Sequence, residues 1–455
     1  MKKTVMRSYA KLIVRVGANV QKGQEVRVFA SLDQPEFIKM LVEECYKAGA
    51  SRVTVDWKYP ELTKLAARYM KLRDLSETRE WEKARMQDMV DHLPVRIFIE
   101  SEDPDGLRGI NPKYFKAFAA RVKISKPYRD AIDNKHQWCI AAVPGEAWAK
   151  KVHPELSKRA AVEQLWKDIL YTARADGEDP IADWEEHNRD LKARSKYLND
   201  LHLRELRYHS ANGTDFKVGL IPTAEFHAGR DTTMQGVIYD PNMPTEEVFT
   251  SPDRRTAEGI VYATKPLSYQ GQLIENFSVR FEKGRAVEVK AEKGQAVLEQ
   301  IISMDEGCHY LGECALVPYD SPINQTGILF YNTLFDENAC CHLALGMGFI
   351  DTIRDYPNRT LEEMRALGVN DSMIHEDFIF LPKWGICAQN RCIFAARMVR
   401  YACTENLTAY LHPTGGDRHE ASPFVHPDRG GAAAQRLHAR IGEHRARAGC
   451  RCTAD

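Results

Sequence analysis

The segment DSMIHEDFIF (371–380) carries two side chains that could bind one metal ion together. In an extended strand, residues i and i+2 project from the same face, so His375 and Asp377 would point together while Glu376 points away. Their backbone positions would lie about 7 Å apart, a separation from which an imidazole and a carboxylate can reach one cation. The segment therefore predicts part of a metal site.

Three further segments each supply an acidic or imidazole side chain beside a turn or at the start of an apolar run. They are PNMPTEEVFTSPD (241–253) with Glu246 and Glu247, YLGECALVPYDSPI (310–323) with Glu313, and NACCHLALGMGF (338–349) with His342. Added to His375 and Asp377, they give a set rich in oxygen with two nitrogens. Such a set suits Zn²⁺, Mn²⁺ or Co²⁺, with carboxylates available to bridge two ions, better than it suits a thiolate zinc site.

Each motif taken alone has a simpler interpretation. A carboxylate near a turn is typical of solvated surface, and one His-x-Asp on a strand is typical of an ordinary paired histidine. Cys340 and Cys341 fit small buried apolar residues as well as they fit ligands. The sequence has neither a C-x-x-C pair at this point nor an H-E-x-x-H motif. Composition and spacing alone leave a metal site as one of two interpretations.

Length and composition limit the classes of function. The 455 residues suffice for two or three domains with a sizeable core. The 63 basic and 64 acidic residues nearly cancel, so we expect no nucleic-acid partner and no membrane partner. Arg7, Lys11 and Arg15 interrupt the first apolar stretch, which argues against a signal peptide. The eleven cysteines are interpreted as reduced thiols, and the predicted location is the cytoplasm.

The elements that must position these residues differ between the two halves. In residues 1–205, strand-like and helix-like segments alternate, which predicts an α/β domain with a mostly parallel sheet. The expected strands are 25–30, 52–57, 95–101 and 136–144, with a helix at 35–50 and a mostly helical stretch at 145–205. Residues 206–384 instead show the hairpin signals Asn212-Gly213 and Lys283-Gly284. They predict a β-rich α+β domain that carries the metal-binding residues, with helices near 294–304 and 360–367.

Residues 385–455 form an atypical tail. This stretch contains ten arginines and five cysteines but no lysine, whereas lysines occur throughout the preceding chain. So abrupt a change fits an appended, disordered tail, and it also fits a shift of reading frame in the coding sequence.

Taken together, the four segments resemble the metal-site segments of the thermophilic-type metallo-aminopeptidases, the family of aminopeptidases T and S and PepS. The first half resembles the same family in YAKLIVRVGANVQKGQEV, EECYKAGA, IESEDPDGLRGINP and DPIADWEEH. The resemblance extends over residues from about 8 to 380 and keeps the order and approximate spacing of the motifs.

The resemblance implies a cytoplasmic, homodimeric exopeptidase that removes N-terminal residues from peptides with a free N-terminus. It implies two divalent ions (Zn, Co or Mn) in an enclosed cavity. The implied metal ligands are Glu247, Glu313, His342, His375 and Asp377. Two cations about 3.5–4 Å apart would lower the pKa of a water and stabilise the oxyanion of the attacked amide. Glu313 could also bridge the ions, and either Glu246 or Glu313 could shuttle the proton.

Two departures from the family pattern keep alternatives open. Phe349 stands where the family usually has a tyrosine, seven residues after the ligand histidine, and a phenyl ring cannot donate a hydrogen bond to an oxyanion. The sequence after Phe380 also departs from the family. One alternative is therefore a metal- or peptide-binding relative with weakened catalysis. The other is a different dinuclear enzyme, a dipeptidase or amidase, on the same scaffold.

Overall fold

The computed structural model describes residues 1–210, 212–380 and 410–413. Of the atypical tail predicted at 385–455, only the short strand β18 (Tyr410–Pro413) belongs to the described residues, and the rest lies outside them. The division into domains at residues 205 and 384 stays a prediction. Among the described helices, none combines the length and apolar character needed to cross a membrane.

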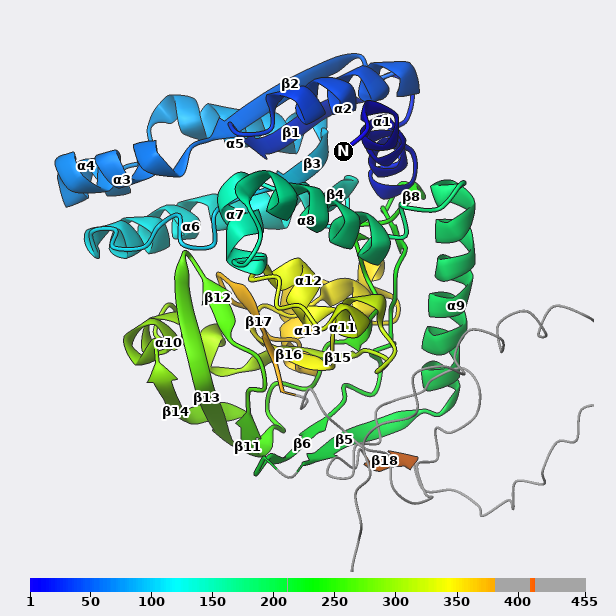
Figure 1. Cartoon of the computed structure of the whole chain (residues 1–455). Helices are drawn as coiled ribbons and strands as arrows, with labels where there is room; N and C mark the ends of the chain where they lie inside the picture. The colour runs from blue at the N-terminus through cyan, green and yellow to red at the C-terminus, as the bar shows by residue number, and fades with distance from the viewer. Residues whose placement is uncertain (211, 381–409, 414–455) are drawn as a thin grey trace, which may run out of the picture. The chain divides into compact units, whose positions relative to one another are not determined.

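The first half supplies four strands of a five-stranded parallel sheet, whose order is β2-β1-β3-β4-β9; Figure 1 labels these four strands, β1 to β4. Its strands are β1 (Glu25–Ser31), β2 (Arg52–Lys58), β3 (Val95–Glu100), β4 (Trp138–Ala142) and β9 (Asn242–Met243). The four strands predicted from alternation are thus present within two residues of their expected ends. β9 comes from the second half of the chain and pairs in parallel with β4.

Helices connect and cover these strands. They are α1 (Lys3–Leu12) with a π-helical turn (Ile13–Gly17), α2 (Pro35–Ala48), α3 (Pro60–Tyr69), α4 (Leu72–Ser76), α5 (Glu80–His92), α6 (Lys113–Ile132), α7 (Glu146–Val152), α8 (Lys158–Thr172) and α9 (Pro180–Asp200). The helix predicted at 35–50 is α2, which starts with a proline and is followed by Gly49, whose φ of 103° suits a residue without a side chain. Figure 1 shows α9 as the long helix that leads into β5 and the second half.

A larger antiparallel sheet begins the second half, in the order β12-β13-β11-β6-β5-β18 with β14 paired to β13. Its other strands are β5 (Leu203–His209), β6 (Asp215–Gly219), β11 (Glu258–Tyr262), β12 (Leu267–Tyr269), β13 (Gln272–Glu282) and β14 (Arg285–Lys293). The turn between β13 and β14 is Lys283-Gly284, as predicted, and both residues have positive φ (49° and 83°). Such angles match the right-handed twist of a two-residue hairpin.

A smaller antiparallel sheet, in the order β10-β15-β16-β17, carries the predicted metal-binding segments. Its strands are β10 (Val248–Thr250), β15 (Leu311–Leu316), β16 (His342–Gly346) and β17 (His375–Ile379). Every residue of β15 and β16 is buried. The remaining elements are β7 (Asp231–Thr232), β8 (Ile238–Tyr239), α10 (Gln295–Ile302), α11 (Pro322–Thr326), α12 (Thr333–Glu337), α13 (Leu361–Leu367) and three short 3-10 turns. α10 and α13 are the helices predicted near 294–304 and 360–367.

Candidate metal centre

The strand register of the smaller sheet places four of the predicted residues on one face. Glu313 of β15 lies opposite Ala344 of β16, and Ala344 lies opposite Asp377 of β17. Directly opposed residues of an antiparallel pair share a face, as do residues two positions apart on one strand. His342 is two residues from Ala344 and His375 is two residues from Asp377, so their side chains join the same face. The i, i+2 argument for His375 and Asp377 therefore holds in the structure.

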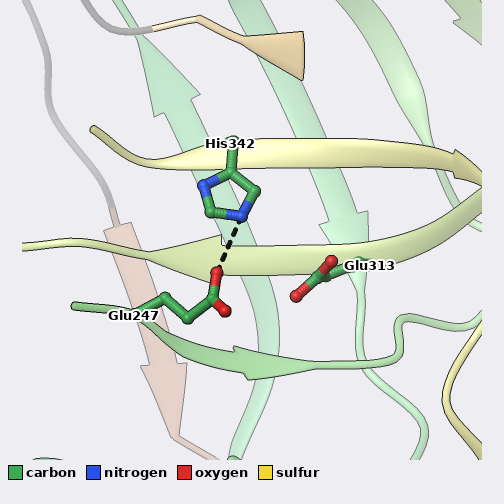
Figure 2. Close-up of side chains that lie close together, drawn as sticks. All are labelled: Glu247, Glu313 and His342. Atoms are coloured by element: carbon green, nitrogen blue, oxygen red, sulfur yellow. Dashed lines mark ion pairs between the residues drawn. The ribbon is translucent and has the colours of Figure 1, made fainter. Parts of the chain in front are cut away.

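Glu247 completes this group from the residue before β10 (Figure 2). Its Oε2 lies 2.9 Å from Nε2 of His342. Nε2 of His375 lies 3.0 Å from Oε2 of Glu313 and 3.5 Å from Oδ1 of Asp377. Two sets of three ligand atoms result, each within 4.8 Å of one another, and both sets contain Glu313.

Both histidines are held with one nitrogen facing the carboxylates. Nδ1 of His342 lies 3.1 Å from the carbonyl oxygen of Cys340, and Nδ1 of His375 lies 2.6 Å from that of Met347. Because a carbonyl only accepts, each Nδ1 carries the hydrogen and each Nε2 is left for the cluster, as in histidines that bind metals. Nε2 of His342 and Oδ1 of Asp377 are buried beside other cluster atoms, but within the described residues neither makes a hydrogen bond of suitable geometry. These residues therefore fit a bound cation.

The charges of the cluster also favour a cation. Burial raises the pKa of Glu313 to about 7, and the negative charges of Asp377 and Glu247 raise it further. The hydrogen bond from His375 acts in the opposite direction and offsets part of this rise. Burial alone would lower the pKa of His342, but pairing with Glu247 and the nearby Asp377 raises it to about 9. Without a metal, the cluster thus offsets its negative charge by holding protons. A divalent cation would displace them, which makes metal binding dependent on pH.

Glu337 is a member of this cluster that the sequence analysis missed. It is the last residue of α12, is 9% exposed, and lines the same cavity as Glu247 and Glu313. Burial and the neighbouring Asp377, Glu247 and Glu313 raise its pKa well above the usual range of a glutamate. The only sequence signal is its position five residues before His342, within a polar run at the end of a helix.

Glu246 lies away from the other predicted residues. Its side chain is 1% exposed and forms an ion pair with Arg174, which follows α8. It is absent from the residues that line the cavity beside Glu247. The two adjacent glutamates therefore point in opposite directions, Glu247 into the metal cluster and Glu246 towards the helices of the first half.

Comparison with known proteins decides the family. Residues 2–388 match the thermophilic metalloprotease (M29) family. The chain belongs to this family. It is 41% identical to aminopeptidase AmpS of Bacillus subtilis over 377 residues, which covers 82% of this chain and 92% of that protein. It is 39% identical to aminopeptidase T of Thermus thermophilus over 372 residues, which covers 81% of this chain and 90% of that protein. The solved structure of wild-type AmpT from Thermus thermophilus superposes with a TM-score of 0.75 at 37% identity, covering 83% of this chain and 93% of that one.

The family membership confirms the resemblance found in the sequence. The predicted fold, an α/β part with a mostly parallel sheet followed by a β-rich α+β part, is confirmed by this superposition and by the sheets themselves. The predicted activity, that of a metal-dependent aminopeptidase hydrolysing peptide bonds, is confirmed by the family and its relatives. A divalent metal and peptide substrates follow from the same membership.

The cluster of this metalloprotease opens into a cavity of about 1220 Å³, lined by both halves of the chain. Trp57, Phe98 and Glu100 line it from the parallel sheet, and the metal cluster lines it from the smaller antiparallel sheet. Phe349 also lines the cavity, with its ring centroid 4.8 Å from that of the His375 imidazole. The residue that replaces the expected tyrosine is therefore in contact with the cluster.

Cys340 and Cys341 are packing residues in this metalloprotease. Both are buried, 6% and 5% exposed, and neither belongs to the two sets of ligand atoms. Sγ of Cys341 accepts a hydrogen bond from the backbone N–H of Val317 at 3.4 Å. Burial raises the pKa of Cys341 to about 12, so it is a neutral thiol at physiological pH. Of the three consecutive residues Cys340, Cys341 and His342, His342 is the one that supplies a ligand atom to the cluster.

Proposed function

We propose that this enzyme removes N-terminal residues from peptides by means of two divalent cations held by Glu247, Glu313, His342, His375 and Asp377. The observation that carries the proposal is the pair of overlapping ligand sets that share Glu313. One set would hold each ion, and Glu313 would contribute to both sets. The proposed metals are Zn²⁺, Co²⁺ or Mn²⁺, because the set combines carboxylate oxygens with two imidazole nitrogens.

When bound, such ions polarise the scissile carbonyl and lower the pKa of a water. The protein's own contribution is to place that chemistry in a cavity and to move the protons. The leaving amine needs a proton from a carboxyl that lines the cavity without holding a metal ion, and Glu337 is such a carboxyl. We do not assign this step to Glu246, since its side chain is buried against Arg174.

The test combines metal content with substrate choice. Protein stripped with a chelator and reloaded with Co²⁺, Mn²⁺ or Zn²⁺ is assayed on aminoacyl-p-nitroanilides and on free and N-acetylated peptides. We expect two metal equivalents per chain, turnover of substrates with a free amine, and none of acetylated ones. A single equivalent at full activity would contradict the dinuclear proposal. His342→Ala serves as the matched variant that lacks one ligand.

Two alternatives have their own signatures in this assay. Metal binding without turnover would favour the relative with weakened catalysis, for which Phe349 is the structural reason. Turnover of dipeptides or simple amides, but not of longer peptides, would favour a dipeptidase or amidase.

We also propose that the enzyme is a homodimer in the cytoplasm. The described residues contain six free, buried cysteines and no disulfide, which suits a reducing compartment. Several large apolar side chains between Trp57 and Trp81 are exposed, including Tyr69 at 75%, and a second copy could cover them. Light scattering on purified protein would measure the mass, and a monomer at micromolar concentration would contradict the dimer.

A further inference from the structure

Side chains from the first half of the chain bind two consecutive residues of the segment that carries Glu247, namely Thr245 and Glu246. Nε2 of His187, on α9, donates a hydrogen bond to the carbonyl oxygen of Thr245 at 2.8 Å. Arg174, two residues after the end of α8, forms an ion pair with the carboxylate of Glu246. His187 is 5% exposed and Glu246 is 1% exposed, so both contacts are shielded from water. A buried hydrogen bond and a charge-assisted ion pair together hold this stretch of backbone in one position.

A third contact ties the same segment to the other side of the cluster. The backbone N–H of Glu246 donates to Oδ1 of Asn338 at 2.8 Å, and Nδ2 of Asn338 donates to Oε1 of Glu337 at 3.3 Å. Asn338 is fully buried, and its own carbonyl oxygen accepts from the hydroxyl of Ser321 at 2.7 Å. One amide side chain therefore spans the distance between the Glu247 segment and the carboxylate of Glu337.

From these contacts we infer that Glu246 is a positioning residue for the metal centre. Its bond with Arg174 fixes the direction in which the next residue, Glu247, enters the cluster, and its backbone N–H orients Asn338 and thereby Glu337. The inference rests on the proposed function, because it assumes that Glu247 binds metal. It assigns no proton transfer to Glu246, in contrast to the expectation from the sequence.

Two substitutions of Glu246 separate positioning from proton transfer. Glu246→Gln keeps the volume and an oxygen that accepts from Arg174, but it cannot exchange a proton at neutral pH. Glu246→Ala removes the bond with Arg174. Groups that orient metal ligands typically change metal affinity by 10–100-fold when they are replaced. We therefore expect Glu246→Ala to weaken Co²⁺ binding by roughly 10–100-fold, whereas Glu246→Gln stays close to wild type.

The readout is the affinity of chelator-stripped protein for Co²⁺ alone, followed by titration calorimetry and by the visible absorption of bound Co²⁺. The kcat at saturating Co²⁺ and its pH profile are measured as well. Positioning predicts that excess Co²⁺ restores most of the kcat of Glu246→Ala and that its pH profile keeps both limbs. A Glu246→Gln variant with unchanged Co²⁺ affinity and a collapsed kcat would overturn the inference in favour of proton transfer.

Two controls keep the experiment interpretable. Arg174→Met with Glu246→Leu removes both charges at similar volume, so no charge is left buried without a partner, and the protein should fold. We expect this double variant to bind Co²⁺ as weakly as Glu246→Ala. Asp168→Asn removes the negative charge from another buried pair of the first half, in which Nε2 of His153 lies 2.7 Å from Oδ2 of Asp168.

Asp168→Asn should lower the stability without changing the affinity for Co²⁺. An equal loss of affinity in Asp168→Asn would overturn the inference, because the effect would then be a general loss of stability. Wild-type protein that binds no Co²⁺ would overturn the proposed function and this inference together. Wild-type binding with an unchanged Glu246→Ala affinity would overturn the inference alone.

Discussion

Replacing Phe349 by tyrosine tests whether this position limits the rate. The backbone N–H of Phe349 donates to Oγ of Ser251 at 2.7 Å, which fixes the start of the side chain. The phenyl ring of Phe349 packs against two other rings: its centroid lies 4.8 Å from that of the His375 imidazole and 5.1 Å from that of the Phe249 ring. A tyrosine ring can occupy the same place and extend its hydroxyl beyond the ring, from a residue that already lines the cavity. The substitution adds a hydrogen-bond donor without repacking a core.

The expected gain follows from what one such donor contributes. A single donor placed at a developing oxyanion accounts for roughly 10²–10³ in kcat, or about 2.7–4 kcal/mol, where the site is built around it. Here the ring is held on two sides but nothing has been arranged to orient a hydroxyl, so only part of that effect should appear. We expect Phe349→Tyr to raise kcat by at least about 10-fold, which corresponds to about 1.4 kcal/mol of transition-state stabilisation.

The assay is the steady-state hydrolysis of an aminoacyl-p-nitroanilide by metal-saturated enzyme. Because the donor acts on the transition state, kcat and kcat/KM should rise together while KM stays nearly constant. Phe249→Tyr is the matched control, since it adds the same hydroxyl to the neighbouring ring of the same cavity. An unchanged kcat/KM in Phe349→Tyr, or an equal rise in Phe249→Tyr, would refute the reasoning.

The other predictions concern the metal, the cluster and pH. His342→Ala should lower kcat/KM by at least about 100-fold and reduce the bound metal measured by elemental analysis, whereas Cys341→Ala should leave the metal content unchanged. Burial and the neighbouring carboxylates raise the pKa of Glu337, so its ionised form destabilises the metal-free protein. In chelator, Glu337→Gln should therefore raise the free energy of unfolding near pH 7, measured by denaturant titration, while the metal-induced rise in Tm should shrink. Burial, and then the charge of Arg96, lowers the pKa of His136 to about 4. The unfolded chain therefore binds this proton more readily between about pH 6.5 and 4, so the free energy of unfolding should fall as the pH drops through that window. Comparison of wild type with His136→Gln in chelator measures this contribution, and equal slopes against pH would contradict it.

Much of this fold could be predicted because local patterns and long-range packing agree. The alternating residues of β1 and β2 form strands within one residue of the expected ends, and the Lys283-Gly284 turn adopts the positive φ angles that its residue types favour. The pair His375 and Asp377 could be predicted as neighbours on one face, because the period of a strand fixes the direction of side chains two residues apart.

Other features depend on contacts between distant segments. Glu337 ends a five-residue helix, and no periodicity in so short an element indicates which way its side chain points. Two adjacent glutamates alternate in direction along an extended chain, but nothing local indicates which of them faces the cluster. Glu246 points away from the cluster and pairs with Arg174, which is 72 residues away from it in the sequence.

The segment around these glutamates also explains why the two halves act as one catalytic unit. Its first strand, β9, completes the parallel sheet beside β4, and its last strand, β10, pairs with β15 of the sheet that carries Glu313. Only four residues separate the two strands, and they include both Glu246 and Glu247. A shift of either sheet relative to the other must therefore move Glu247, since so short a connection cannot absorb the displacement. Substitutions of His187 or Arg174, which bind this segment from α9 and from the residues after α8, should accordingly affect metal binding even though neither side chain is a predicted metal ligand.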